Sequence, residues 1–184
     1  MRPRARVRRP GGIPSRVMKR WLPFGLVALG VVLIAYALLG SSDEDRIRAL
    51  LDRLAEAVRV EEGNTNPLVR HGQVNEAFKE IFAKEASASV AELGRGIHGR
   101  EELVRAATQV GSVYRVAYVT LGDVRLAIDS AGGTAEVDAT ATITGARHGQ
   151  ETRQDERTVK IRVEKIEGDW RIFSVMVGAR PDGE

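Results

Sequence analysis

The sequence has no cysteine and only three histidines among its 184 residues. Without cysteine, the chain can form neither disulfides nor thiolate-ligated metal sites. The histidines, His71, His98 and His148, are far apart in the sequence and lack the short spacing of metal ligands. We therefore expect neither a metal site nor a cofactor.

Basic residues outnumber acidic ones in one segment only, and this segment accounts for the formal net charge of +3. Residues 1–20 hold eight of the 28 Lys and Arg residues and no acidic residue. All 25 acidic residues therefore lie in the remainder, with only 20 basic ones, which makes that part mildly acidic. A nucleic-acid-binding domain would carry its basic patch on the fold itself, so we expect no nucleic-acid partner.

Charge is absent from residues 21–40, WLPFGLVALGVVLIAYALLG. About 20 apolar helical residues span the hydrocarbon core of a bilayer. Trp21 and Tyr36 lie near the ends of this run, where amphipathic rings favour the membrane interface. Because the basic segment comes first, the positive-inside rule predicts a cytoplasmic tail at residues 1–20 and an extracytoplasmic domain after the span. These features predict a single-pass protein of the cell (inner) membrane, which contacts the lipid bilayer through residues 21–40.

A cleaved signal peptide is the alternative interpretation of the same run. Ala35, Tyr36 and Ala37 form a small-x-small motif of the kind that signal peptidases cut. However, this motif lies inside the apolar run, and the run is longer than the roughly 7–15 residues of a signal core. The pattern therefore favours a retained anchor.

Three amphipathic helices are predicted after the span. Ser41 or Ser42, with Glu44 or Asp45 three residues later, forms a capping box that starts the first helix. Apolar residues at helical spacing then predict three stripes: Ile47, Leu50, Leu51, Leu54, Ala55 and Val58; Val74, Ala77, Phe78, Ile81 and Phe82; Leu103, Val104, Ala107 and Val110. Gly, Asn and Pro predict a loop over residues 61–73, and Gly111 is expected to end the third helix.

The period changes from 3.6 to 2 after Gly111, which predicts four strands in a meander over residues 114–129, 134–144, 159–163 and 170–177. A further short strand is expected at residues 86–90, and Gly122 is a candidate bulge. The alternation places one set of apolar residues on the inner face of the sheet: Ala135, Val137, Ala139, Ala141, Ile143, Val159, Ile161 and Val163.

Charged residues take the opposite parity on these strands and should form the outer, solvated face. A turn at residues 148–150 would place Glu136 opposite Arg162 and Asp138 opposite Lys160, where opposite charges stabilise the pairing. Residues 167–169, Glu-Gly-Asp, predict a tight hairpin before the last strand.

The order of these elements resembles the nuclear transport factor 2-like (SnoaL-like) superfamily, as do HGREELV (residues 98–104) and EGDWRI (residues 167–172). The resemblance covers residues 43–177 and implies an α+β cone, in which three helices pack on a curved antiparallel sheet. The expected domains are the tail (1–20), the transmembrane helix (21–40), the cone domain (41–178) and a flexible C-terminal tail (179–184).

Members of this superfamily include isomerases, dehydratases and epoxide hydrolases, and also non-enzymatic binding and assembly domains. The resemblance places His98 at the mouth of the cone, but the sequence shows no Ser, Cys or acid that would orient it. Glu101 and Glu102 suit the first turn of a helix, where acids oppose the dipole, so we interpret this segment as a helix start. We expect no catalytic residue; the candidate pocket-lining residues are Tyr114, Tyr118, His98 and Trp170.

The leading functional hypothesis is a membrane-anchored binding or assembly module with a protein partner or a second copy of itself. The alternative is a small-molecule-binding protein or a lyase or isomerase that uses the cone. An open pocket with an inward carboxylate or histidine would favour the enzyme, and a filled interior would favour the module.

Overall fold

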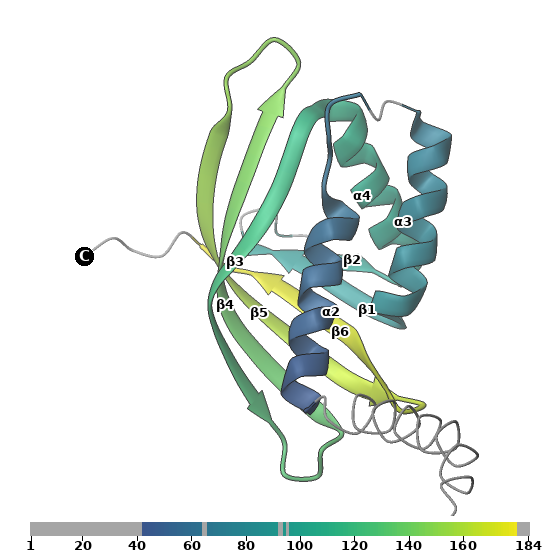
Figure 1. Cartoon of the computed structure of the whole chain (residues 1–184), viewed down its shortest axis with the longest axis vertical. Helices are drawn as coiled ribbons and strands as arrows, with labels where there is room; N and C mark the ends of the chain where they lie inside the picture. The colour runs from purple at the N-terminus through teal and green to yellow at the C-terminus, as the bar shows by residue number, and fades with distance from the viewer. Residues whose placement is uncertain (1–41, 64–65, 92–93, 95, 180–184) are drawn as a thin grey trace, which may run out of the picture. The chain divides into compact units, whose positions relative to one another are not determined.

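The computed structural model describes residues 42–63, 66–91, 94 and 96–179 (Figure 1). The predicted basic tail (1–20), the predicted membrane span (21–40) and residues 180–184 lie outside this part. Within it, no helix is both long enough and apolar enough to cross a membrane.

Three helices pack against one face of a curved six-stranded sheet, as the predicted α+β class requires (Figure 1). The helices are α2 (Asp43–Val58), α3 (Pro67–Ile81) and α4 (Arg100–Val113). The strands are β1 (Phe82–Val90), β2 (Gly96–His98), β3 (Tyr114–Ile128), β4 (Thr134–Arg147), β5 (Arg153–Ile166) and β6 (Asp169–Val177). Their order in the sheet is β2-β1-β6-β5-β4-β3.

The sheet is mixed, and the expectation of a wholly antiparallel sheet is wrong. Strands β3 to β6 form the predicted antiparallel meander, but β1 pairs with β6 in parallel. Hairpin turns force consecutive strands to be antiparallel, whereas β1 and β6 are separated by most of the domain. No local signal in the sequence could therefore reveal their relative direction.

Helix α3 begins at Pro67, inside the segment that was expected to be a loop. The Asn66 side chain accepts hydrogen bonds from the backbone N–H groups of Leu68 (3.1 Å) and Val69 (3.4 Å) and so caps the helix. Proline is well suited to the first helical position, where its missing N–H has no partner to lose. The residues that suggested a loop are therefore the start signal of a helix.

Helix α4 continues through Gly111 to Val113, so the prediction that Gly111 ends it is wrong. A Cβ atom at this glycine would lie 2.5 Å from Nε of Arg70, a side chain that is only 6 % exposed. The Arg70 guanidinium donates to the carbonyl oxygens of Arg59 (2.9 Å) and Val58 (3.3 Å) at the end of α2. Gly111 thus makes room for a buried arginine, and burial lowers the pKa of that guanidinium.

The strand register confirms the predicted inside and outside faces over most of β4, although Thr144, which the same alternation places outside, is only 1 % exposed. Glu136 lies opposite Arg162 and Asp138 lies opposite Lys160, and all four are exposed. Asp138 and Lys160 form an ion pair at 3.3 Å, whereas Arg162 pairs with Glu164 of its own strand at 3.1 Å. The predicted inner residues are buried, apart from Ile143, which is 38 % exposed.

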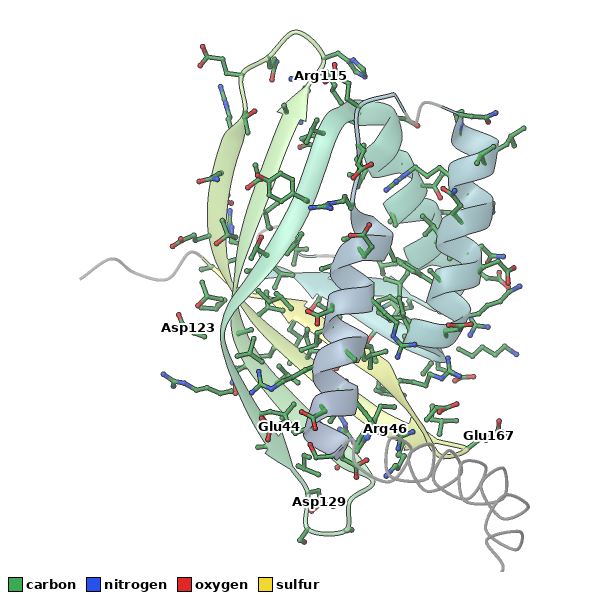
Figure 2. All side chains as sticks on the ribbon, viewed as in Figure 1. Glu44, Arg46, Arg115, Asp123, Asp129 and Glu167 are labelled. Atoms are coloured by element: carbon green, nitrogen blue, oxygen red, sulfur yellow. The ribbon has the colours of Figure 1, made fainter. Side chains whose placement is uncertain are left out.

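A bulge interrupts β3 where Gly122 predicted one. The register between β3 and β4 shifts between Gly122 and Arg125, and Asp123 within this interval has a positive φ of 49°. Asp123 points away from the helices (Figure 2). The bulge bends the strand and contributes to the curvature of the sheet.

The start of α2 is fastened to the β5–β6 hairpin through Asp43. Its carboxylate accepts hydrogen bonds from Trp170 Nε1 (2.9 Å) and Lys165 Nζ (3.0 Å). Both contacts, the Trp170 bond first, hold the pKa of Asp43 below its usual value, so this carboxyl is ionised at neutral pH. Nearby, Arg46 donates to the Gly168 carbonyl at 3.0 Å, in the hairpin that carries Glu167 (Figure 2).

Candidate ligand pocket

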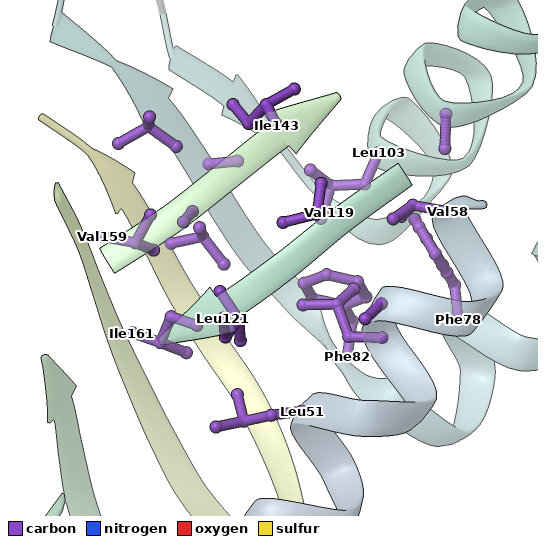
Figure 3. Close-up of a pocket in the computed structure, with 17 residues that line it drawn as sticks. Leu51, Val58, Phe78, Phe82, Leu103, Val119, Leu121, Ile143, Val159 and Ile161 are labelled. Carbon is purple, nitrogen blue, oxygen red and sulfur yellow. The ribbon is translucent and has the colours of Figure 1, made fainter. Parts of the chain in front are cut away.

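A pocket of about 260 Å³ lies between α2, α4 and the concave face of the sheet (Figure 3). Its lining consists only of alanine and larger apolar side chains: Leu51, Leu54, Ala55, Val58, Phe78, Phe82, Ala88, Leu103, Ala107, Val119, Leu121, Ala141, Ile143, Val159, Ile161, Val175 and Val177. None of these side chains can donate or accept a hydrogen bond or exchange a proton. The pocket therefore offers an uncharged, apolar environment.

The distribution of side-chain size along the elements explains why this space stays open. In the first half of α2, Ile47 and Leu50 are fully buried against the sheet. In its second half, Leu54 and Val58 are only partly buried and face the pocket instead. Ala107 of α4 is one of four alanines in the lining and leaves space that a larger residue would fill.

Ile143 marks the junction of the apolar pocket with a second, polar groove of about 590 Å³. It lines both spaces and is 38 % exposed. The groove is formed by the C-terminal end of α4, the first residues of β3, the last residues of β4 and the first residues of β5. Its lining residues are Val110, Tyr114, Ala117, Ile143, Thr144, Gly145, Arg147, Gln150, Glu151, Arg153, Gln154 and Asp155.

An aromatic ring and an arginine form one wall of this groove. The Tyr114 ring lies against Gly145, where an added Cβ atom would stand 3.1 Å from two ring carbons. Arg147 places its guanidinium carbon 5.4 Å from the centre of the same ring, a cation–π geometry. Gly145 thus permits the ring to lie on the strand, and the ring orients Arg147.

An ion pair stands where the apolar lining of β5 gives way to polar residues. Arg157 Nε and Asp155 Oδ2 are 2.7 Å apart, and residues two apart on a strand share a face. That face is the inner one, because Val159 continues it into the pocket. The predicted inner face ran only from Val159 to Val163, but the same alternation continues backwards through Arg157, Asp155 and Arg153.

None of the four candidate pocket-lining residues predicted from the sequence lines the apolar pocket. Tyr114 lines the polar groove. Tyr118 has the opposite parity to the pocket residue Val119, and the Arg59 guanidinium lies 5.9 Å from its ring centre. Trp170 is 4 % exposed and serves the contact with Asp43. The pocket lining is therefore aliphatic, apart from two phenylalanines, and not the expected set of tyrosine, histidine and tryptophan.

His98 is exposed on the edge strand β2, away from both spaces. Its backbone N–H, not its ring, donates to Glu102 Oε2 at 3.2 Å, across the start of α4. This geometry is the helix start that the sequence indicated. Over the described residues, no group of three or more His, Asp or Glu side chains is placed to hold a metal ion.

Several solved structures share this fold at low sequence identity. A protein of unknown function from Mycobacterium tuberculosis is 21 % identical, with a TM-score of 0.56 over 72 % of this chain and 68 % of that one. An NTF2-like protein with a cystatin-like fold from Novosphingobium aromaticivorans is 15 % identical (TM-score 0.55; 83 % and 90 % covered). A provisionally named scytalone dehydratase from the same species is 12 % identical (TM-score 0.59; 77 % and 88 % covered).

A comparison with curated proteins found no match. The sequence model of the SnoaL-like domain, in contrast, matches residues 67–175, which is more than half of the chain. This match covers α3, α4 and nearly all of the sheet, whereas α2, which supplies one wall of the pocket, precedes it. The chain therefore belongs to the SnoaL-like domain family, within the NTF2-like superfamily.

Proposed function

We propose that this SnoaL-like domain is a membrane-anchored, non-catalytic binding module that takes a small apolar ligand into its pocket. The observation that carries the proposal is the lining itself, in which all 17 residues are apolar. Transfer of apolar surface out of water contributes roughly 25 cal/mol per Å², and such a lining has no polar group to desolvate. Its volume is near the lower end of the roughly 300–1,000 Å³ of small-molecule pockets, which suits a single hydrocarbon chain.

A lyase or isomerase is the alternative, and one structure with this fold carries the provisional name of a dehydratase. General acid–base catalysis needs a proton-transferring side chain within about 2.6–3.2 Å of the reacting atom or one water away. The pocket lining supplies none, and Asp155, which lies on the same face of β5 in the polar groove, is paired with Arg157. These observations favour binding over catalysis.

The pocket is tested by filling it. We expect Ala107→Phe to reduce saturable labelling by a photoactivatable diazirine fatty alcohol at least tenfold, because the added ring occupies the ligand's space. The full chain in lipid nanodiscs is labelled, and mass spectrometry locates the modified peptides. Ala127→Phe, which adds the same ring at an exposed position of β3, is the matched control and should label like the unmodified protein.

Circular dichroism must show that the Ala107→Phe protein is folded. If the folded variant labels as well as the unmodified protein, the pocket is not the binding site. In that case an assembly role gains weight, because apolar side chains are exposed where α3 begins and α4 ends: Leu68, Val69, Val110 and Val113.

The anchor is part of the same proposal and rests on the uncharged residues 21–40 behind eight basic residues. We expect the full chain to stay in the membrane pellet after alkaline carbonate washing, and its intact mass to include residues 1–40. A mature chain that begins near Leu38 would show instead that the segment is a cleaved signal peptide. A tag placed after residue 184 should be digested by protease added from outside the inner membrane, and a tag before residue 1 should be protected.

A further inference from the structure

We infer that the ligand is a single-chain amphiphile with an anionic head, whose chain fills the apolar pocket and whose head lies in the adjoining polar groove. This inference rests on the proposed function and adds the ligand's chemical class. The head is a carboxylate or a phosphate, since both can accept two parallel hydrogen bonds from the guanidinium group of arginine.

The two spaces meet at one residue on the inner face of the sheet. Ile143 lines both, and its partner on β3, Val119, lies in the pocket. The next inward pair, Ala117 opposite Gly145, belongs to the groove. Both have little or no side chain, and the Tyr114 ring, which lies over Gly145, forms the wall beside this junction. A molecule with one apolar end and one polar end matches this change in lining.

The groove offers two arginines for a negative head. Arg147 stacks on Tyr114 and makes no ion pair with the described part of the chain, and neither does Arg153. Of the two carboxylates in the groove, Asp155 is already neutralised by Arg157, which leaves Glu151 at the exposed turn. The groove beside the pocket therefore carries two positive charges without an ion-pair partner in the described part of the chain, on Arg147 and Arg153, against one remaining negative charge, on Glu151.

The position of the arginines on the strands gives the head a defined site. Arg153 lies opposite Gly145 on β5, and Arg147 is two residues beyond Gly145 on β4, so both share its face. The Tyr114 ring fills the space above Gly145 and supports Arg147. A charged head held here leaves its chain pointing along Ile143 towards the pocket.

Competition in the labelling assay tests the inference. The full chain in zwitterionic nanodiscs is labelled with the diazirine fatty alcohol in the presence of decanoic acid, decyl phosphate, decanol or decyltrimethylammonium. We expect the acid and the phosphate to compete better than decanol and the cation. Arg147→Gln and Arg153→Gln should each weaken competition by both anions about three- to fivefold, as for exposed ion pairs, and leave decanol unchanged.

Arg125→Gln is the matched control, because it removes the same charge from an exposed position of β3 outside the groove. Partition into the nanodisc is the same for every variant, so the ratio between variants reports only the protein. If only decyl phosphate responds to the arginine changes, the head is a phosphate; if only decanoic acid responds, it is a carboxylate. If neither responds while Ala107→Phe still abolishes labelling, the amphiphile inference is overturned and the apolar-ligand proposal stands.

Discussion

Replacing Leu50 by alanine is expected to lower the free energy of unfolding by about 3 kcal/mol. Leu50 is 0 % exposed and packs in the core cluster between α2 and the sheet. The substitution removes apolar contacts and leaves a cavity that the surrounding sheet can close only in part. Urea denaturation of the full chain in mild detergent, followed by circular dichroism, measures the change.

Leu68→Ala is the matched control for this experiment. Leu68 is 83 % exposed at the start of α3, so the same truncation should change the stability by no more than about 0.5 kcal/mol. Equal losses from the two leucines would contradict the placement of α2 against the sheet. A small loss at both would show that the core does not depend on this helix.

Gly111→Ala is expected to destabilise the domain by about 1–3 kcal/mol, although alanine is the better helix former. The new Cβ atom would stand 2.5 Å from Nε and 2.6 Å from Cδ of Arg70. Arg70 cannot easily move away, because its guanidinium is hydrogen-bonded to the end of α2. The same urea titration measures the loss.

Gly72→Ala supplies the control, since Gly72 lies in α3 with nothing within 4 Å of the position of an added Cβ. There the usual advantage of alanine should appear as a gain of about 0.5–1 kcal/mol. Opposite signs at the two glycines would support a packing role for Gly111. A gain at both would mean that Arg70 adjusts freely and that its contacts with α2 are weak.

Local sequence signals determined the elements and their faces. Ser42 with Asp45 marks the start of α2, and both members of the capping box are present in the structure. Strict alternation from Ala135 to Ala141 fixed which residues are buried, because a slip by one residue would expose the whole apolar set. These properties depend on residues close together in the chain, so a periodic pattern is enough to predict them.

Tertiary structure alone decided the remaining features, because they depend on residues far apart in the sequence. Gly111 looks like a helix terminator until Arg70, far earlier in the chain, is found beside it. Trp170 was expected to line a pocket, but in the structure its indole N–H donates a hydrogen bond to Asp43, which lies far earlier in the chain. The sequence by itself thus determined an α+β domain, the inner and outer faces of its sheet, and an uncharged segment before it. The pocket, the polar groove beside it and the parallel pairing of β1 with β6 arise only when distant strands and helices meet.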